Sequence, residues 1–116
     1  MTLKLYGLSK CSTCLKAMAW LEAHNIDHEF TDLRTNPPAH GQLARWSERL
    51  GSWEKMINRA GYTWRGLPAE ETAGLGEAEA RLLALKYPAL IRRPLIEHND
   101  GRITVGFSKA VQETLA

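Results

Sequence analysis

The sequence predicts an α/β domain in which one mixed sheet joins a βαβ unit to a later ββα unit. The first 33 residues contain a short apolar strand, an amphipathic helix and a second strand, and such a crossover pairs its strands in parallel. Near the end of the chain, two short apolar runs flank Asp100-Gly101, a strong signal for an antiparallel hairpin. Between the two units the apolar residues recur mostly at helical spacing, which indicates an all-helical insertion.

The length and charge of the chain limit its organisation. A chain of 116 residues is long enough to bury one core, so we expect a single domain over 1–116. Its core comprises about 1–35 and 88–116, and the helical insertion comprises about 36–87. The net charge of +2 is small and evenly spread, which argues against binding to nucleic acid or an anionic membrane. No leader pattern or apolar stretch of membrane length is visible, and we expect a cytoplasmic monomer.

The βαβ unit comes first. The opening strand covers 2–6 and the helix that follows covers 12–24. Asn25 is a residue type that often ends a helix, and the second strand covers 27–33. Asn36-Pro37-Pro38 then interrupts the pattern and begins the insertion.

The insertion begins with its clearest amphipathic segment. Leu43, Trp46 and Leu50 lie on one face of a predicted helix over 39–50, and Gly51 follows as its C-terminal cap. The rest of the insertion is predicted to contain a short helix over 53–57, a turn-rich stretch over 58–68, a short helix over 69–74 and a longer helix over 77–87 that ends before Pro88.

The ββα unit completes the chain. Strands over 95–98 and 102–105 flank the Asn99-Asp100-Gly101 turn. Ser108 is placed to cap a closing helix, whose inner side is predicted to carry Ala110, Val111 and Leu115. A parallel βαβ unit and an antiparallel ββα unit that share one sheet form a thioredoxin-like arrangement.

Cys11 and Cys14, the only cysteines in the chain, lie where the first strand gives way to the first helix. The partial positive charge and free N–H groups at a helix N-terminus favour thiolate over thiol, so Cys11 is a candidate nucleophile. Cys14 has two interpretations: a partner thiol for Cys11, or a buried apolar residue on the same helical face as Ala17 and Leu21. A zinc site is not indicated, because it would need two more ligands and the histidines are scattered.

Several cations are candidates to serve this thiol. Arg93 precedes Pro94 at the start of the third strand, where a thioredoxin-like layout commonly places a cis proline close to the reactive thiol. The Arg93 guanidinium can stabilise a thiolate or bind a carboxylate or oxyanion, although a plain surface arginine is the alternative. Lys10 adjoins Cys11 in the sequence.

Two further arginines are weaker candidates for the site, and one carboxylate is not a candidate. Arg59 and Arg65 lie in a turn-rich segment of a kind that can close over a site. Trp64 in that segment is equally compatible with a role in the core. Asp32 has no spacing that a reaction would require, and we interpret it as an ordinary surface or strand residue.

Beyond these local patterns, an ordered series of short motifs resembles the ArsC/Spx family. The motifs are Leu5-Tyr6-Gly7, Cys11-x-x-Cys14, Lys16-Ala17, Trp20-Leu21-Glu22, Arg59, Thr63-Trp64-Arg65-x-Leu67, Pro88-x-x-Ile91-x-Arg93-Pro94-Leu95 and Gly106-Phe107-Ser108. They span nearly the whole chain and are most similar to the YffB-type branch of small bacterial thiol reductases. This resemblance implies a thioredoxin core with a helical insertion, in agreement with the reading of the individual elements.

The resemblance also implies roles for several residues. In ArsC-type enzymes the cysteine that matches Cys11 attacks the substrate, and the arginines that match Arg59 and Arg93 hold an oxyanion. Two features of those enzymes are absent: a histidine shortly before the cysteine, and a third arginine that is replaced within 105–107. We therefore expect a thiol reductase with glutathione or another small thiol as co-substrate, no tightly bound cofactor and no metal. Arsenate reduction is a third choice.

The main alternative that the resemblance implies is a redox-sensing regulator. Spx-type proteins bind the C-terminal domain of the RNA polymerase α subunit and use a Cys-x-x-Cys pair as a disulfide switch. This chain shares the cysteine pair and the Gly106-Phe107 motif. Its residues 45–55 align poorly with the segment that carries the polymerase contact in those regulators.

Overall fold

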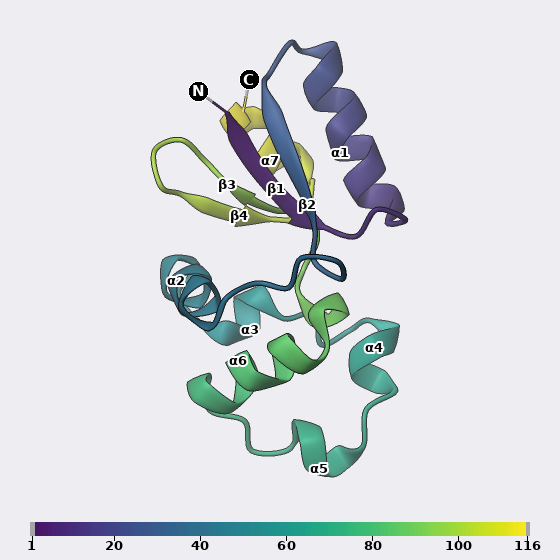
Figure 1. Ribbon diagram of the computed structural model, residues 1–116, viewed down its shortest axis with the longest axis vertical. Coiled ribbons are helices and arrows are strands. Elements are labelled where there is room, and N and C mark those ends of the chain that lie inside the picture. Colours follow the sequence, from purple (N-terminus) through teal and green to yellow (C-terminus); the bar gives the residue numbers. More distant parts are fainter. Residues whose placement is uncertain (1, 116) are drawn as a thin grey trace.

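The strand β1 (Leu3–Gly7) lies inside the sheet that organises the molecule (Figure 1). The computed structural model describes residues 2–115, and within that part of the chain four strands pair in the order β2–β1–β3–β4. The strand β1 pairs in parallel with β2 (His28–Asp32) and antiparallel with β3 (Leu95–Glu97), which pairs antiparallel with β4 (Ile103–Val105). The predicted mixed sheet and thioredoxin-like architecture are confirmed.

One face of the sheet is covered by α1 (Ser12–Ala23) and α7 (Lys109–Leu115). Their apolar side chains share one cluster with the sheet, formed by buried Leu3, Leu5, Ala17, Leu21 and Ile96 together with Phe107, Val111 and Leu115. The Ser108 hydroxyl accepts a hydrogen bond from the Val111 N–H at 3.4 Å, as expected of a cap. The prediction that Ala110 faces inward is wrong, because Ala110 is exposed. Val111 and Leu115 define the inner stripe of this helix, and Ala110 lies about 100° around the axis from Val111.

The opposite face of the sheet meets the helical insertion, which Figure 1 shows as a group of short helices beyond the sheet. Its elements are α2 (His40–Leu50), α3 (Trp53–Met56), α4 (Tyr62–Arg65), α5 (Ala69–Thr72), α6 (Glu77–Lys86) and the 3₁₀ turn η1 (Pro88–Leu90). Trp46 on α2 is fully buried and lies against Tyr6 with ring centroids 4.8 Å apart. Trp64 packs against the same cluster, which supports its core interpretation. The stretch predicted as turns contains the single-turn helix α4.

The insertion is tied to the entrance of β3 by backbone hydrogen bonds. Ile57 forms an antiparallel bridge with Ile91. The Asn58 N–H donates to the Leu90 carbonyl, and the Arg92 N–H donates to the Met56 carbonyl, each at 2.8 Å. This ladder brings the end of α3 beside the segment that leads into Arg93-Pro94. None of the helices within 2–115 combines the length and apolarity needed to cross a membrane.

Candidate active site around Cys11

Cys11 lies in the loop that joins the carboxyl end of β1 to the first turn of α1. It is the N-cap residue of α1, with an extended backbone (φ −81°, ψ 122°). Its carbonyl accepts the Leu15 N–H at 3.0 Å, and its own N–H donates to the Leu8 carbonyl at 3.1 Å. The half-buried thiol therefore sits at the start of a helix, where free N–H groups favour an anion.

The surroundings of Cys11 lower its pKa below the ordinary value. Burial opposes ionisation, but hydrogen bonds outweigh it and favour the thiolate. The donors are the backbone N–H and thiol of Cys14, the guanidinium of Arg93 and the backbone N–H of Thr13. Two side chains, those of Cys14 and Arg93, therefore stabilise the thiolate in addition to the helix N-terminus that the sequence predicts.

Cys14 is fully buried and has the opposite character. Burial chiefly raises its pKa to about 12, and the negative charge and hydrogen bond of Cys11 add to that effect. Cys14 is therefore a thiol that donates to the Cys11 thiolate in the reduced protein, in which both cysteines are free. The two interpretations from the sequence combine here, because Cys14 shares the buried face of α1 with Ala17 and Leu21 while it contacts Cys11.

Arg93 lies beside this thiol pair. Its guanidinium donates to the Ala89 carbonyl at 2.6 Å and also hydrogen-bonds Cys11. The Arg93–Pro94 peptide is cis, as the sequence predicts, and the Pro94 carbonyl accepts the Gly106 N–H at 3.0 Å. The hydrogen bonds to Ala89 and Gly106 thus hold this segment where the Arg93 guanidinium meets the Cys11 thiol.

Two surface hollows meet at Cys11 and Arg93. The first, here called the hairpin hollow, has a volume of about 230 Å³ and is lined by Cys11, Thr13, Asn58, Ile91, Arg92, Arg93, Val105 and Gly106. The second, here called the loop hollow, has a volume of about 560 Å³ and is lined by Leu8, Ser9, Lys10, Cys11, Ser12, Asp32, Arg34, Thr35 and Arg93. The larger hollow contains the predicted residue Lys10, which is exposed.

The structure does not bring Arg59 or Arg65 to these hollows. The Arg59 guanidinium lies 5.5 Å from the centre of the Trp53 ring and 3.9 Å from Glu54. The Arg65 guanidinium lies 5.0 Å from the centre of the Tyr62 ring. The proposed site roles of both arginines stay predictions, and each would require its side chain to leave its present contacts.

Asp32 is a site residue that the sequence interpretation missed. It is the parallel partner of Gly7 in the β1–β2 ladder, so it adjoins the loop that carries Cys11. Its Oδ2 accepts the Ser9 N–H at 3.0 Å and its Oδ1 accepts the Arg34 N–H at 2.8 Å. These backbone donors hold the pKa of Asp32 below its usual range. Its position at the end of the second strand could have indicated this, since the carboxyl ends of the parallel strands β1 and β2 lie at the same edge of the sheet.

Asn58 was also missed, because only the bridge between Ile57 and Ile91 brings it to the hairpin hollow.

Metal ligands do not gather near the site: within 2–115, no three His, Cys, Asp or Glu side chains are placed to share an ion. The chemistry that the site geometry supports is that of the thiol pair beside Arg93.

Comparisons with known proteins agree with this geometry. The model of the ArsC family matches residues 6–115. A solved structure named YffB is 37% identical, covers 98% of this chain and 99% of its own, and has a TM-score of 0.90. The structure of an arsenate reductase (ArsC) related protein from Brucella melitensis is also 37% identical, covers 98% and 93%, and has a TM-score of 0.78. The global transcriptional regulator Spx 2 of Bacillus cereus is 30% identical over 108 residues, 90% of this chain and 79% of that protein.

Proposed function

The chain belongs to the ArsC family, and from that premise we propose that it is a cytoplasmic thiol–disulfide oxidoreductase. Cys11 is the nucleophile, Cys14 is the resolving thiol, and Arg93 stabilises the thiolate and the incoming anionic group. Glutathione or another small thiol is the co-substrate, and no tightly bound cofactor takes part. The observation that carries this proposal is the position of Cys11 as the N-cap of α1, beside Arg93 and the buried Cys14, an arrangement that lowers the pKa of Cys11 and raises that of Cys14.

The reaction proceeds in two exchanges. The Cys11 thiolate attacks one sulfur of a small disulfide, a protein–substrate S–S bond forms, and the other half leaves as a thiolate that takes up a proton. Cys14 then loses its proton and attacks Cys11 of the mixed disulfide, which forms the Cys11–Cys14 disulfide and releases the second small thiol. One small disulfide is reduced to two thiols while the protein dithiol is oxidised. Two molecules of an external thiol then reduce the Cys11–Cys14 disulfide in two further exchanges and leave as their own disulfide.

A small organic disulfide suits the larger hollow better than arsenate does. Asp32 lines the loop hollow and remains ionised at neutral pH. Lys10, Arg34 and Arg93 in the same hollow attract an anion, but the Asp32 carboxylate offsets part of that attraction for an oxyanion that carries more than one negative charge. An organic substrate that bears both signs of charge can instead direct a cationic group towards Asp32.

Treatment with oxidised glutathione followed by intact-protein mass spectrometry tests the proposal. We expect a stable glutathione adduct on the Cys14→Ser variant, and an internal disulfide with little adduct on the wild-type protein. The Cys11→Ser variant is the matched control and should form no adduct in the folded state. Absence of any adduct on Cys14→Ser, or efficient production of arsenite from arsenate, would contradict the proposal.

A redox-sensing regulator is the second candidate, favoured by the Spx relative and by the same pair of cysteines. In this case the partner is the C-terminal domain of the RNA polymerase α subunit. Purified α C-terminal domain should then bind the protein with an affinity that changes when the Cys11–Cys14 disulfide forms. Titration calorimetry on the reduced and oxidised protein distinguishes this candidate from the enzyme, for which no binding is expected.

A further inference from the structure

The loop hollow carries charges of both signs next to the reactive thiol. Asp32 contributes a carboxylate, while Lys10, Arg34 and Arg93 contribute cations. Within residues 2–115, no ion pair joins Asp32 to any of these three side chains. The hollow therefore presents an anionic and a cationic group to a ligand without either neutralising the other.

Backbone donors fix the Asp32 carboxylate at the wall of the loop hollow. Each of its oxygens accepts one backbone N–H, from Ser9 and from Arg34. The Ser9 hydroxyl and the Thr35 N–H also stabilise the charge of Asp32, so a ligand ammonium would compete with these donors for the carboxylate. The same backbone bonds hold the carboxylate in place at the carboxyl end of β2, where the side chain is half-exposed.

Arg34 supplies the complementary charge two residues farther along the chain. Its side chain is exposed and lines the hollow, while its backbone N–H is bound to Asp32. A guanidinium binds a carboxylate through two parallel hydrogen bonds. A ligand group that bears an ammonium and a carboxylate on one carbon matches this pair of side chains.

We propose that the loop hollow binds the α-amino acid head group of a low-molecular-weight disulfide, with Asp32 accepting the ammonium and Arg34 binding the carboxylate. The inference rests on the proposed function, because it places the sulfur of that substrate against Cys11. Two sources share this chemistry: a free amino acid disulfide, which is cystine, and a γ-glutamyl peptide disulfide, which is oxidised glutathione.

A set of disulfides with different charges tests the inference. The set comprises neutral 2-hydroxyethyl disulfide, dicationic cystamine, dianionic 3,3′-dithiodipropionate, cystine and oxidised glutathione. In a Cys14→Ser background the mixed disulfide at Cys11 persists, so quenched mass spectrometry gives its rate of formation with each compound. Each rate is divided by the rate for the neutral disulfide, which cancels any change in the reactivity of Cys11 itself.

Adding Asp32→Asn should lower the normalised rate about tenfold for cystamine, cystine and oxidised glutathione, since each loses a charge-assisted hydrogen bond. The same substitution should leave the rate for dithiodipropionate unchanged or faster. Arg34→Gln should lower the normalised rates of the carboxylate-bearing disulfides and spare cystamine. Whichever of cystine and oxidised glutathione loses more in both variants identifies the source of the head group.

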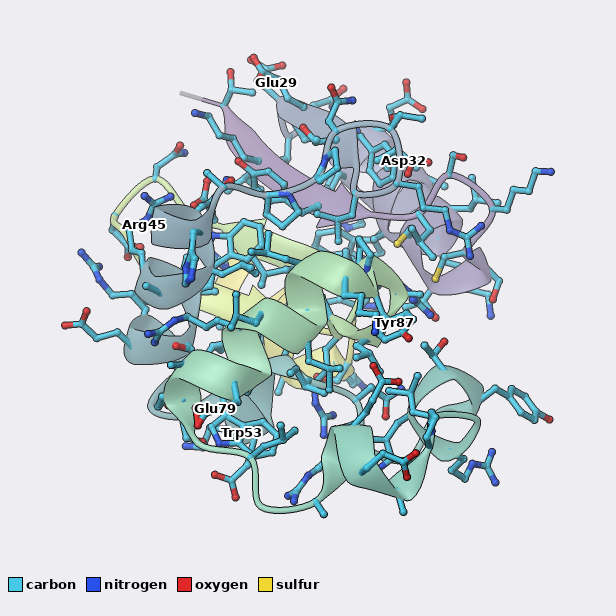
Figure 2. The ribbon with its side chains drawn as sticks, turned by 60° about the horizontal axis from the view of Figure 1, so that its bottom comes forward. Glu29, Asp32, Arg45, Trp53, Glu79 and Tyr87 are labelled. Carbon is cyan, nitrogen blue, oxygen red and sulfur yellow. The ribbon has the colours of Figure 1, made fainter. Side chains whose placement is uncertain are left out.

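Glu29→Gln is the matched control. Glu29 is an exposed carboxylate on the same strand, and Figure 2 shows it well apart from Asp32. This variant should change none of the normalised rates. If Asp32→Asn slows every disulfide equally, including the neutral one, Asp32 acts only on the Cys11 loop and the inference is overturned. If Cys11 reacts with none of the compounds, the proposed function fails instead.

Discussion

The thiol of Cys14 occupies the space that a Cβ atom on Gly7 would fill. A methyl group at Gly7 would approach the Cys14 sulfur more closely than Cβ atoms approach other atoms in real structures. Its next neighbours, a ring carbon of Phe30 at 3.5 Å and the Cβ of Cys14 at 3.7 Å, are at ordinary contact distances. The absence of a side chain at the end of β1 therefore determines where the Cys14 thiol can sit, and with it the hydrogen bond to Cys11.

Gly7→Ala should slow alkylation of Cys11 by iodoacetamide at neutral pH about tenfold, because the displaced Cys14 thiol no longer donates to the thiolate. The measurement is the rate of iodoacetamide labelling at several pH values, with circular dichroism to establish that the variant is folded.

A double-mutant cycle separates this effect from a general disturbance of the fold. In a Cys14→Ala background the sulfur is gone, and only the ordinary contacts with Phe30 at 3.5 Å and with the Cβ of residue 14 at 3.7 Å remain. There, Gly7→Ala should leave the alkylation rate nearly unchanged. An equal loss of rate in both backgrounds would show that Gly7 acts on the loop and not through Cys14.

The two cysteines should differ sharply in their reaction with iodoacetamide. The midpoint of the pH–rate profile of Cys11 should lie below the ordinary thiol pKa of about 8.5, because hydrogen bonds from Cys14 and Arg93 favour the thiolate. The buried Cys14, with a pKa of about 12, should react only after unfolding. Mass spectrometry of native and denatured samples counts the labels, and a midpoint at or above the ordinary value would remove the case for an activated nucleophile.

Arg93→Ala should lower the rate of mixed-disulfide formation with oxidised glutathione at neutral pH by roughly ten- to a hundredfold, since a hydrogen bond from a charged donor is lost. Arg93→Lys should recover part of the rate, because lysine restores the positive charge but not the planar guanidinium that donates two parallel hydrogen bonds. Arg102→Ala, which removes an exposed arginine from the hairpin, is the control and should have little effect. Unfolding of Arg93→Ala with unchanged reactivity of Cys11 would mark Arg93 as structural.

The sequence was most informative where the signal is local. Periodicity and the Asp100-Gly101 turn predicted the order of the strands and helices, and the position of Pro94 predicted the cis peptide beside the thiol. Asp32 was interpreted as an ordinary surface or strand residue because its place beside the Cys11 loop depends on parallel register with Gly7. Asn58 was missed because its place depends on a bridge across the insertion.

Arg59 shows the converse: the sequence predicted a site role for it, and the structure places its side chain away from the thiol. Its neighbour Asn58 reaches the hairpin hollow, yet the Arg59 side chain lies over Trp53 on α3. Adjacent residues can thus face different parts of the molecule, and only the tertiary contacts of each side chain decide which one meets the thiol.

Glu97→Gln should lower the free energy of unfolding by roughly 1–3 kcal/mol, because Glu97 joins the sheet to α2 through charge-assisted hydrogen bonds. The Glu97 carboxylate accepts from Tyr6 at 3.0 Å, from the Trp46 indole at 2.9 Å and from Arg45 at 2.6 Å. Burial opposes its ionisation, but these donors outweigh burial and lower its pKa. The carboxylate therefore stabilises the fold above its unfolded-state pKa of about 4.3, and that contribution is lost as the pH falls through the lower folded-state value.

Urea denaturation of the wild type and the variant at neutral and acidic pH measures this contribution. The difference between them should be largest at neutral pH and should shrink as the wild-type carboxylate becomes protonated. Glu29→Gln, at an exposed position of β2, should change the free energy of unfolding by less than about 0.5 kcal/mol at either pH. Because Glu97 holds Arg45 and Trp46 of α2, loss of these hydrogen bonds should also reduce the protection of the α2 amides from hydrogen exchange. A pH-independent difference between Glu97→Gln and wild type would mean that shape and packing, not the charge of Glu97, join the insertion to the sheet.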